Sequence, residues 1–189
     1  IVPLKGCYIP QVDDTVIGRI VDVGMSGWFV NIGAPYPALL PASEALQRGR
    51  SFPQVDLTRI FDVTDLVVAK VIAFDRTRDP LLSVKGMGLG KVNSGRVVEL
   101  SPPKIPRLIG RKGSMIGMIA KETGCRITVG QNGVILISGR SALNERVAMA
   151  AIYMIEREAH TRGLTDRIRE MLMEEIGGKE TGKSSGKAA

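Results

Sequence analysis

The chain has 189 residues, with 26 lysines and arginines against 19 aspartates and glutamates, and a formal net charge of +7. Its 44% hydrophobic and 24% charged residues are typical of a folded protein with one medium or two small domains. The charge favours nucleic acid over a membrane as partner, because no long apolar span or lysine-rich amphipathic helix is present. The two cysteines lack metal-like or redox-like spacing, which indicates a reducing compartment, the cytoplasm.

The first half of the chain has the strand pattern of a small β-barrel. Residues 1–12 contain prolines and little periodicity, so we expect a linker or the end of an N-terminal segment there. Strands are expected at 15–23, 27–32, 39–40, 66–74 and 81–84, with a short helix at 43–48 and a long polar loop at 48–59. Five short strands within so few residues predict a closed all-β barrel.

Three stretches of this barrel, residues 18–21, 27–32 and 38–44, carry a family pattern. On them, residues 13–85 resemble an S1-type RNA-binding domain, which is an OB-fold barrel. Trp28 and Phe29 are neighbours on one strand and must point to opposite faces, so one belongs to the core. The resemblance implies that Phe29 lies on the binding face and stacks on bases. Arg76 and Arg78, in the turn before the last strand, are candidates for phosphate contacts.

The barrel departs from the S1 pattern at two positions. Pro41 stands where the family commonly has a histidine, and Ser26 stands where an aromatic residue is often found. Two interpretations therefore stay open: a barrel that binds RNA by stacking, and a docking barrel whose Phe29 packs on a neighbour.

A glycine-rich stretch at 86–94 is expected to be a hinge, and the pattern after it is that of a mixed α/β unit. Strands are expected at 95–100, 125–129 and 134–138, and a long helix is expected after Ser141. Between the first two strands, an apolar pair enters a turn, Gly110-Arg111-Lys112-Gly113, and an amphipathic helix leaves it. The bare spacing of the two glycines is weak evidence, since it also occurs at 24/27 and 130/133.

The turn at 110–113 has the chemistry of a phosphate clamp. Its glycines lack a Cβ and allow another backbone to approach, and the amides at the start of the following helix favour an anion. No acidic residue occurs between Glu99 and Glu122, an interval that holds five basic residues. We therefore expect aspartate at Gly110 or Gly113 to weaken RNA binding with little loss of fold.

The order β-α-turn-α-β-β-α with an Ile-Gly-x-x-Gly-x-x-Ile core at 109–116 resembles a KH domain, over residues 95–160. The resemblance implies a module that clamps about four nucleotides of single-stranded RNA. A C-terminal helix at 161–176 and a disordered tail at 177–189 are expected to follow. The residues expected to bind RNA in this unit are Lys104, Arg107, Ile109, Gly110, Arg111, Lys112, Gly113 and Ser114.

Residues for catalysis, a metal or a cofactor are not evident. The single histidine, His160, falls at an expected helix end, and the acidic pairs fall in turns. No His/Cys cluster has zinc-site spacing. We expect a binding subunit that performs no chemistry.

An S1 domain followed by one KH domain resembles the RNA-binding cap family of the archaeal exosome, the ribosomal-RNA-processing protein four family. That family has a further small β domain at its amino end, of which only the last residues could be present here. The resemblance implies a trimeric cap of three copies on a hexameric phosphorolytic ring, holding single-stranded RNA and feeding 3′ ends into the pore for degradation or processing. Catalysis would belong to the ring.

Two other classes of protein carry these modules. Polynucleotide phosphorylase is an enzyme in which KH precedes S1, and its catalytic core is too long for this chain. An S1/KH transcription elongation or translation factor that binds single-stranded RNA is the main alternative, although elongation factors of that kind usually carry two KH domains.

Overall fold

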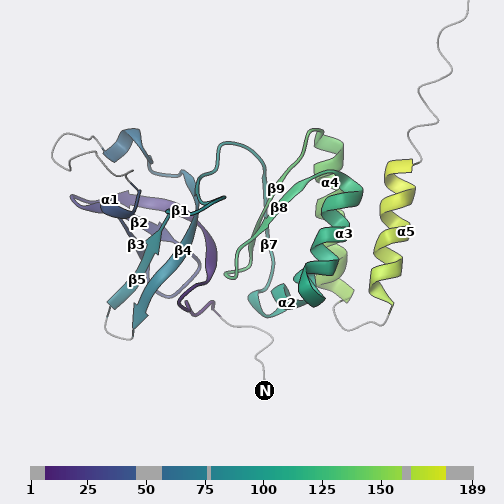
Figure 1. The fold of residues 1–189 in the computed structure, drawn as a ribbon, viewed down its shortest axis with the longest axis horizontal. Coiled ribbons are helices and arrows are strands. Elements are labelled where there is room, and N and C mark those ends of the chain that lie inside the picture. The colour runs from purple at the N-terminus through teal and green to yellow at the C-terminus, as the bar shows by residue number, and fades with distance from the viewer. Residues whose placement is uncertain (1–6, 46–56, 76–77, 159–162, 178–189) are drawn as a thin grey trace, which may run out of the picture. The chain divides into compact units, whose positions relative to one another are not determined.

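The structure is a computed structural model that describes residues 7–45, 57–75, 78–158 and 163–177. It divides into two units (Figure 1). The first comprises residues 1–94 and 129–135, and the second comprises residues 95–128 and 136–189. The expectations for Arg76, His160 and the tail from residue 178 lie outside the described residues.

The first unit is a closed five-stranded barrel, as the sequence predicts. Its strands are β1 (Thr15–Val23), β2 (Gly27–Asn31), β3 (Ala38–Pro41), β4 (Leu66–Asp75) and β5 (Arg78–Ser83). They are ordered β1-β2-β3-β5-β4, and pairing of β1 with β4 closes the barrel. The short helix α1 (Ala42–Ala45) follows β3, and a 3₁₀ turn, Leu57–Arg59, precedes β4.

The barrel core is built around Trp28. Its side chain is fully buried, its indole Nε1 donates a hydrogen bond to the Phe61 carbonyl at 2.9 Å, and the two rings pack edge to face at 5.1 Å. Burial of this ring is favourable because its one polar group has a partner. Phe29, the next residue on β2, is half-buried on the outer face, as the alternation of a strand requires.

The barrel begins before the first strand. Tyr8 is buried in the core cluster, and its hydroxyl donates a hydrogen bond to Asp14 Oδ2 at 2.6 Å. Burial, and then this bond to a carboxylate, raise the pKa of the Tyr8 phenol. The sequence predicts a linker over 1–12, whereas Tyr8 is part of the barrel core. The sequence conceals this because one buried aromatic between prolines has no periodicity.

The expected hinge at 86–94 also holds regular structure. Gly90 and Lys91 form a two-residue strand, β6, which pairs with β4 at Val67 and Val68. The amide of Val92 donates to the Leu66 carbonyl at 2.9 Å, and Lys91 forms an ion pair with Asp65. A strand of two residues has no hydrophobic pattern, so the sequence showed only the glycines, which predict a hinge.

The turn at 130–133 groups with the first unit. The buried Asn132 side chain accepts a hydrogen bond from the Ile17 amide at 3.2 Å and donates to the carbonyls of Ile17 and Ile32 at 2.8 and 3.0 Å. Both donor positions of Nδ2 and one acceptor position of Oδ1 are thus used by backbone groups. This Gly-x-x-Gly is thus a structural turn.

The second unit has the predicted order of elements (Figure 1): β7 (Arg96–Glu99), α2 (Ile105–Ile109), α3 (Ser114–Thr123), β8 (Arg126–Val129), β9 (Val134–Ser138) and α4 (Ala142–Glu158). The strands are ordered β7-β9-β8. Ser141 precedes α4, and its hydroxyl accepts a hydrogen bond from the Leu143 amide at 3.3 Å, as a capping residue does. A 3₁₀ turn, Pro102–Lys104, leads into α2.

Buried stripes at helical spacing hold the helices of the second unit together. In α3 the stripe is Met115, Ile119 and Thr123. The last helix, α5 (Leu164–Gly177), buries Leu164, Ile168 and Leu172 and packs on α3 and α4. Its fourth-residue spacing is that of an amphipathic helix with one apolar side.

Candidate nucleic-acid interface

The Gly-x-x-Gly turn joins α2 to α3 through three residues with positive φ. Gly110, directly after α2, has φ 72° and ψ −176°, Lys112 has φ 52°, and Gly113 has φ 78° and ψ 13°. The Gly110 amide donates to the Pro106 carbonyl at 3.0 Å and closes α2. The helix α3 thus begins directly after this four-residue turn.

The two glycines are needed for different reasons. At Gly110 a Cβ would lie 2.9 Å from the Cβ of Met115 and 3.0 Å from its backbone nitrogen, and the backbone occupies a region that is essentially restricted to glycine. At Gly113 the nearest atom to a Cβ would be 3.9 Å away, so only the left-handed φ disfavours a side chain. The geometry at Gly110 therefore predicts, against the expectation from the sequence, that aspartate there costs stability, because steric crowding adds to backbone strain.

A hollow of about 440 Å³ lies against this turn. It is lined by Pro106 and Arg107 from α2, by Gly110 and Arg111 from the turn, by Ser114 and Met115 from α3, and by Thr165 from α5. Among the described residues, the lining includes two guanidinium groups and two hydroxyl groups and no carboxylate. Such a hollow favours an anion with polar oxygens, the chemistry of a phosphodiester.

The structure brings four of the eight expected residues of this unit into the hollow: Arg107, Gly110, Arg111 and Ser114. Lys112 is exposed on the turn, whereas Ile109 and Gly113 are half-buried. Lys104 lies elsewhere: its Nζ donates to the Glu156 carbonyl at 3.0 Å and lies 3.7 Å from Glu156 Oε1. Sequence reasoning missed Met115 and Thr165 as lining residues.

The outer face of the barrel carries the second candidate site. Phe29 pairs with Asp22 on β1 and with Leu39 on β3, and Leu39 pairs in turn with Leu81 on β5. Paired residues share one face of a sheet, so Phe29, Leu39 and Leu81 form a half-buried apolar row across three strands. An aromatic ring at one end of such a row is suited to base stacking.

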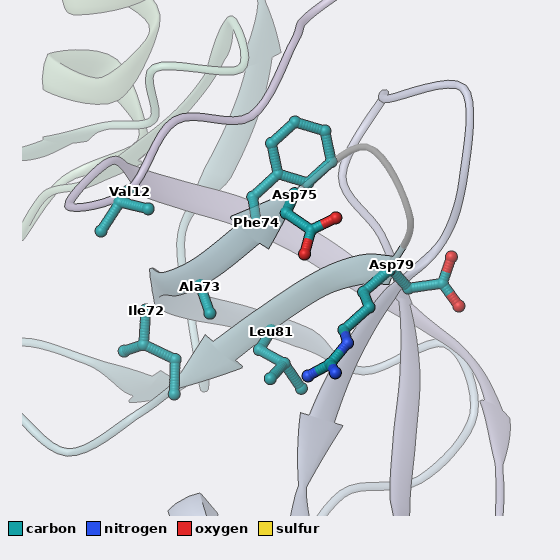
Figure 2. A pocket seen from close by; sticks show the side chains of 8 residues that line it. Val12, Ile72, Ala73, Phe74, Asp75, Asp79 and Leu81 are labelled. Atoms are coloured by element: carbon teal, nitrogen blue, oxygen red, sulfur yellow. The ribbon is translucent and has the colours of Figure 1, made fainter.

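A hollow of about 270 Å³ lies at the other end of this row, beside the β4–β5 hairpin (Figure 2). Figure 2 shows Ile72, Ala73 and Leu81 together, with the Asp79 carboxylate pointing away from them. The lining is completed by Val12, Phe74, Asp75 and Arg78. Two carboxylates against one guanidinium make this hollow less suited to a phosphate than the one at the turn. Arg78 is thus placed at the barrel hollow.

Metal-binding clusters and membrane-spanning helices are both absent from the described part of the chain. Among those residues, no group of three or more His, Cys, Asp or Glu side chains is placed to hold a metal ion. No helix there has the length and apolar character needed to cross a bilayer.

A closed barrel and a β-α-α-β-β-α unit with a basic Gly-x-x-Gly turn define a two-module protein built from nucleic-acid-binding folds. Comparison with known proteins supports both modules. The KH domain family matches residues 96–156, and the family described as the S1 domain of RRP4 matches residues 7–73.

Curated relatives of similar architecture carry the description exosome complex component Rrp4. The protein from Sulfurisphaera tokodaii is 49% identical, over 94% of this chain and 72% of its own length. The one from Thermofilum pendens is 44% identical, over 93% of this chain and 74% of its own length. A crystal structure described as that of a candidate exosome complex RNA-binding protein superposes with a TM-score of 0.84 at 44% identity, covering 91% of this chain and 98% of that one. The chain belongs to the Rrp4 family of exosome components.

Proposed function

We propose that this chain is the RNA-binding subunit of an exosome and that its KH turn holds the phosphodiester backbone of single-stranded RNA. One observation carries the proposal: the glycine-dependent turn lies against a hollow whose charged lining, within the residues that the structure describes, is Arg107 and Arg111. The relatives named as exosome components supply the cellular setting.

The barrel is the second contact in this proposal. The row of Phe29, Leu39 and Leu81 offers bases an apolar surface, and Arg78 lies near its far end. Because the adjoining hollow carries two carboxylates, we assign the barrel the role of contacting bases rather than phosphates. The KH turn then supplies most of the salt-dependent affinity.

The proposed place in the complex is a non-catalytic cap. Three copies would sit on a hexameric phosphorolytic ring and pass single-stranded 3′ ends to its pore, in the cytoplasm, where the exposed Cys7 stays reduced. The support is family membership and the binding character of both modules. Catalysis is assigned to the ring.

Two measurements test these assignments. The chain should bind fluorescein-labelled single-stranded RNA more tightly than double-stranded DNA, and Lys112→Asp should weaken binding at least tenfold. Aspartate tolerates the left-handed conformation of this position, so the substitution tests charge rather than folding. Full RNA affinity in a folded Lys112→Asp protein would contradict the clamp. For the cap, affinity purification should recover exosome ring subunits, and recovery of a polymerase or ribosome instead would favour the factor class.

A further inference from the structure

The helix α5 lies beyond the residues that match the KH family, yet it reaches the Gly-x-x-Gly turn. The family match ends at residue 156, and α5 begins at Leu164. Thr165, the second residue of α5, lines the same hollow as Gly110 and Arg111. A residue from outside the matched module thus forms one wall of the candidate RNA site.

Packing fixes the position of α5 within its unit. Leu164, Ile168 and Leu172 are buried, with at most 1% of their surface exposed, and the helix contacts both α3 and α4. Near its start, Arg167 Nη2 donates a hydrogen bond to Glu158 Oε1 at 3.0 Å, and Arg167 Nη1 lies 2.8 Å from Glu158 Oε2. This ion pair ties the first turn of α5 to the end of α4. Thr165 is held at the hollow by these contacts on either side of it.

The chemistry of Thr165 matches that of the other lining residues. Its side chain is exposed and carries a hydroxyl that can donate to a phosphate oxygen and accept from a ribose 2′-hydroxyl. Ser114 supplies a second hydroxyl, and Arg107 and Arg111 supply positive charge. The volume of about 440 Å³ falls in the range of pockets that hold small ligands, which is the size class of one nucleotide.

We infer that α5 completes the RNA site of the KH unit and that Thr165 contacts the sugar-phosphate backbone of the nucleotide held at the Gly-x-x-Gly turn. This inference rests on the proposed function and adds a residue that the KH module itself lacks. It predicts a contact that is polar but uncharged, so its loss should lower affinity without changing the number of counterions released.

Substitutions at Thr165 in the full chain separate this contact from a structural role. Thr165→Val keeps the shape and the branching of the side chain but removes the hydroxyl, and it should weaken binding of labelled single-stranded oligoadenylate roughly three- to tenfold. Its salt slope should equal that of the unmodified chain. Thr165→Ser keeps the hydroxyl and should bind normally.

A pair of substitutions that each introduce one negative charge provides the matched control. Thr165→Glu should weaken binding tenfold or more. The same change at Met173, an exposed residue of α5 outside the hollow, should have little effect. A glutamate in the first turn of α5 favours the helix through its dipole, so lost binding is not explained by unfolding. Far-UV circular dichroism of each variant checks this.

The possible results distinguish failure of the Thr165 inference from failure of the proposed function. Normal binding by both Thr165→Val and Thr165→Glu, while Lys112→Asp loses binding, would overturn the inference and leave the proposed function intact. Equal losses for Thr165→Glu and Met173→Glu would also overturn it, because the effect would then be one of general charge. No RNA binding by the unmodified chain would contradict the proposed function itself.

Discussion

The two glycines of the turn occupy equivalent places in the motif, but the structure predicts very different costs for replacing them. For Gly110→Ala, the glycine-only backbone region costs about 1–3 kcal/mol, and the 2.9 Å approach to the Met115 Cβ adds crowding of about 1–3 kcal/mol. For Gly113→Ala, the nearest atom to the new Cβ is at an ordinary contact distance of 3.9 Å, so only the left-handed φ contributes, about 1 kcal/mol. Gly110→Ala should therefore be the more damaging change, by about 1–5 kcal/mol.

Urea unfolding followed by two probes measures this difference. Far-UV circular dichroism reports chiefly the helices of the second unit, whereas fluorescence reports the single tryptophan, Trp28, in the barrel core. The loss should appear in the circular dichroism transition, with the fluorescence transition as an internal control. Equal destabilisation by the two substitutions would refute the steric reasoning.

Three further predictions concern other parts of the fold. Lys112→Val should be less stable than Lys112→Asn by about 1 kcal/mol, because asparagine tolerates the left-handed φ of 52° and a β-branched residue does not; equal urea midpoints would contradict this. Leu172→Ala should cost about 2–5 kcal/mol by leaving a cavity under α5, measured by the loss of helical signal; an unchanged midpoint would mean that α5 is not packed as described. Hydrogen bonds from Ser83 and then Lys85 hold the pKa of Glu44 below its usual range, so the stabilisation is present above the ordinary glutamate pKa and is lost as the pH falls through the lowered value. Glu44→Gln should therefore reduce the acid sensitivity of barrel unfolding, and an identical pH profile would contradict that assignment.

Local pattern predicted the fold well where elements are long and periodic. The nine-residue strand β1 is rich in β-branched residues and the helix α4 carries apolar residues at helical spacing, and both are present close to the expected bounds. The local sequence pattern was uninformative where the structure of a few residues depends on contacts with residues distant in the sequence. Tyr8 is held by the barrel core, and β6 by its pairing with β4. Neither leaves a local signal.

The candidate site shows the same division. The Gly-x-x-Gly turn could be predicted because its chemistry is local: two glycines, two basic residues and a helix on either side. Thr165 could not, because it reaches the hollow only through the packing of α5, more than fifty residues along the chain. Lys104 illustrates the opposite case, since its charge counts toward a basic segment but its side chain is engaged by Glu156. Its contribution to RNA binding stays a prediction.

The central claim is that the turn at 110–113 contacts the phosphate backbone, and salt dependence tests this most directly. We would titrate single-stranded RNA with the unmodified chain and with an Arg111→Ala, Lys112→Asn variant, over a range of salt concentrations. As a control of equal charge, Arg140→Ala with Arg146→Ala removes two exposed basic residues that do not line the hollow. If both residues of the turn contact phosphates, the slope of log affinity against log salt should fall in magnitude by about 1.4 in the first variant, at roughly 0.7 per contact, and much less in the control. An unchanged slope in the first variant, or an equal fall in both, would contradict the account.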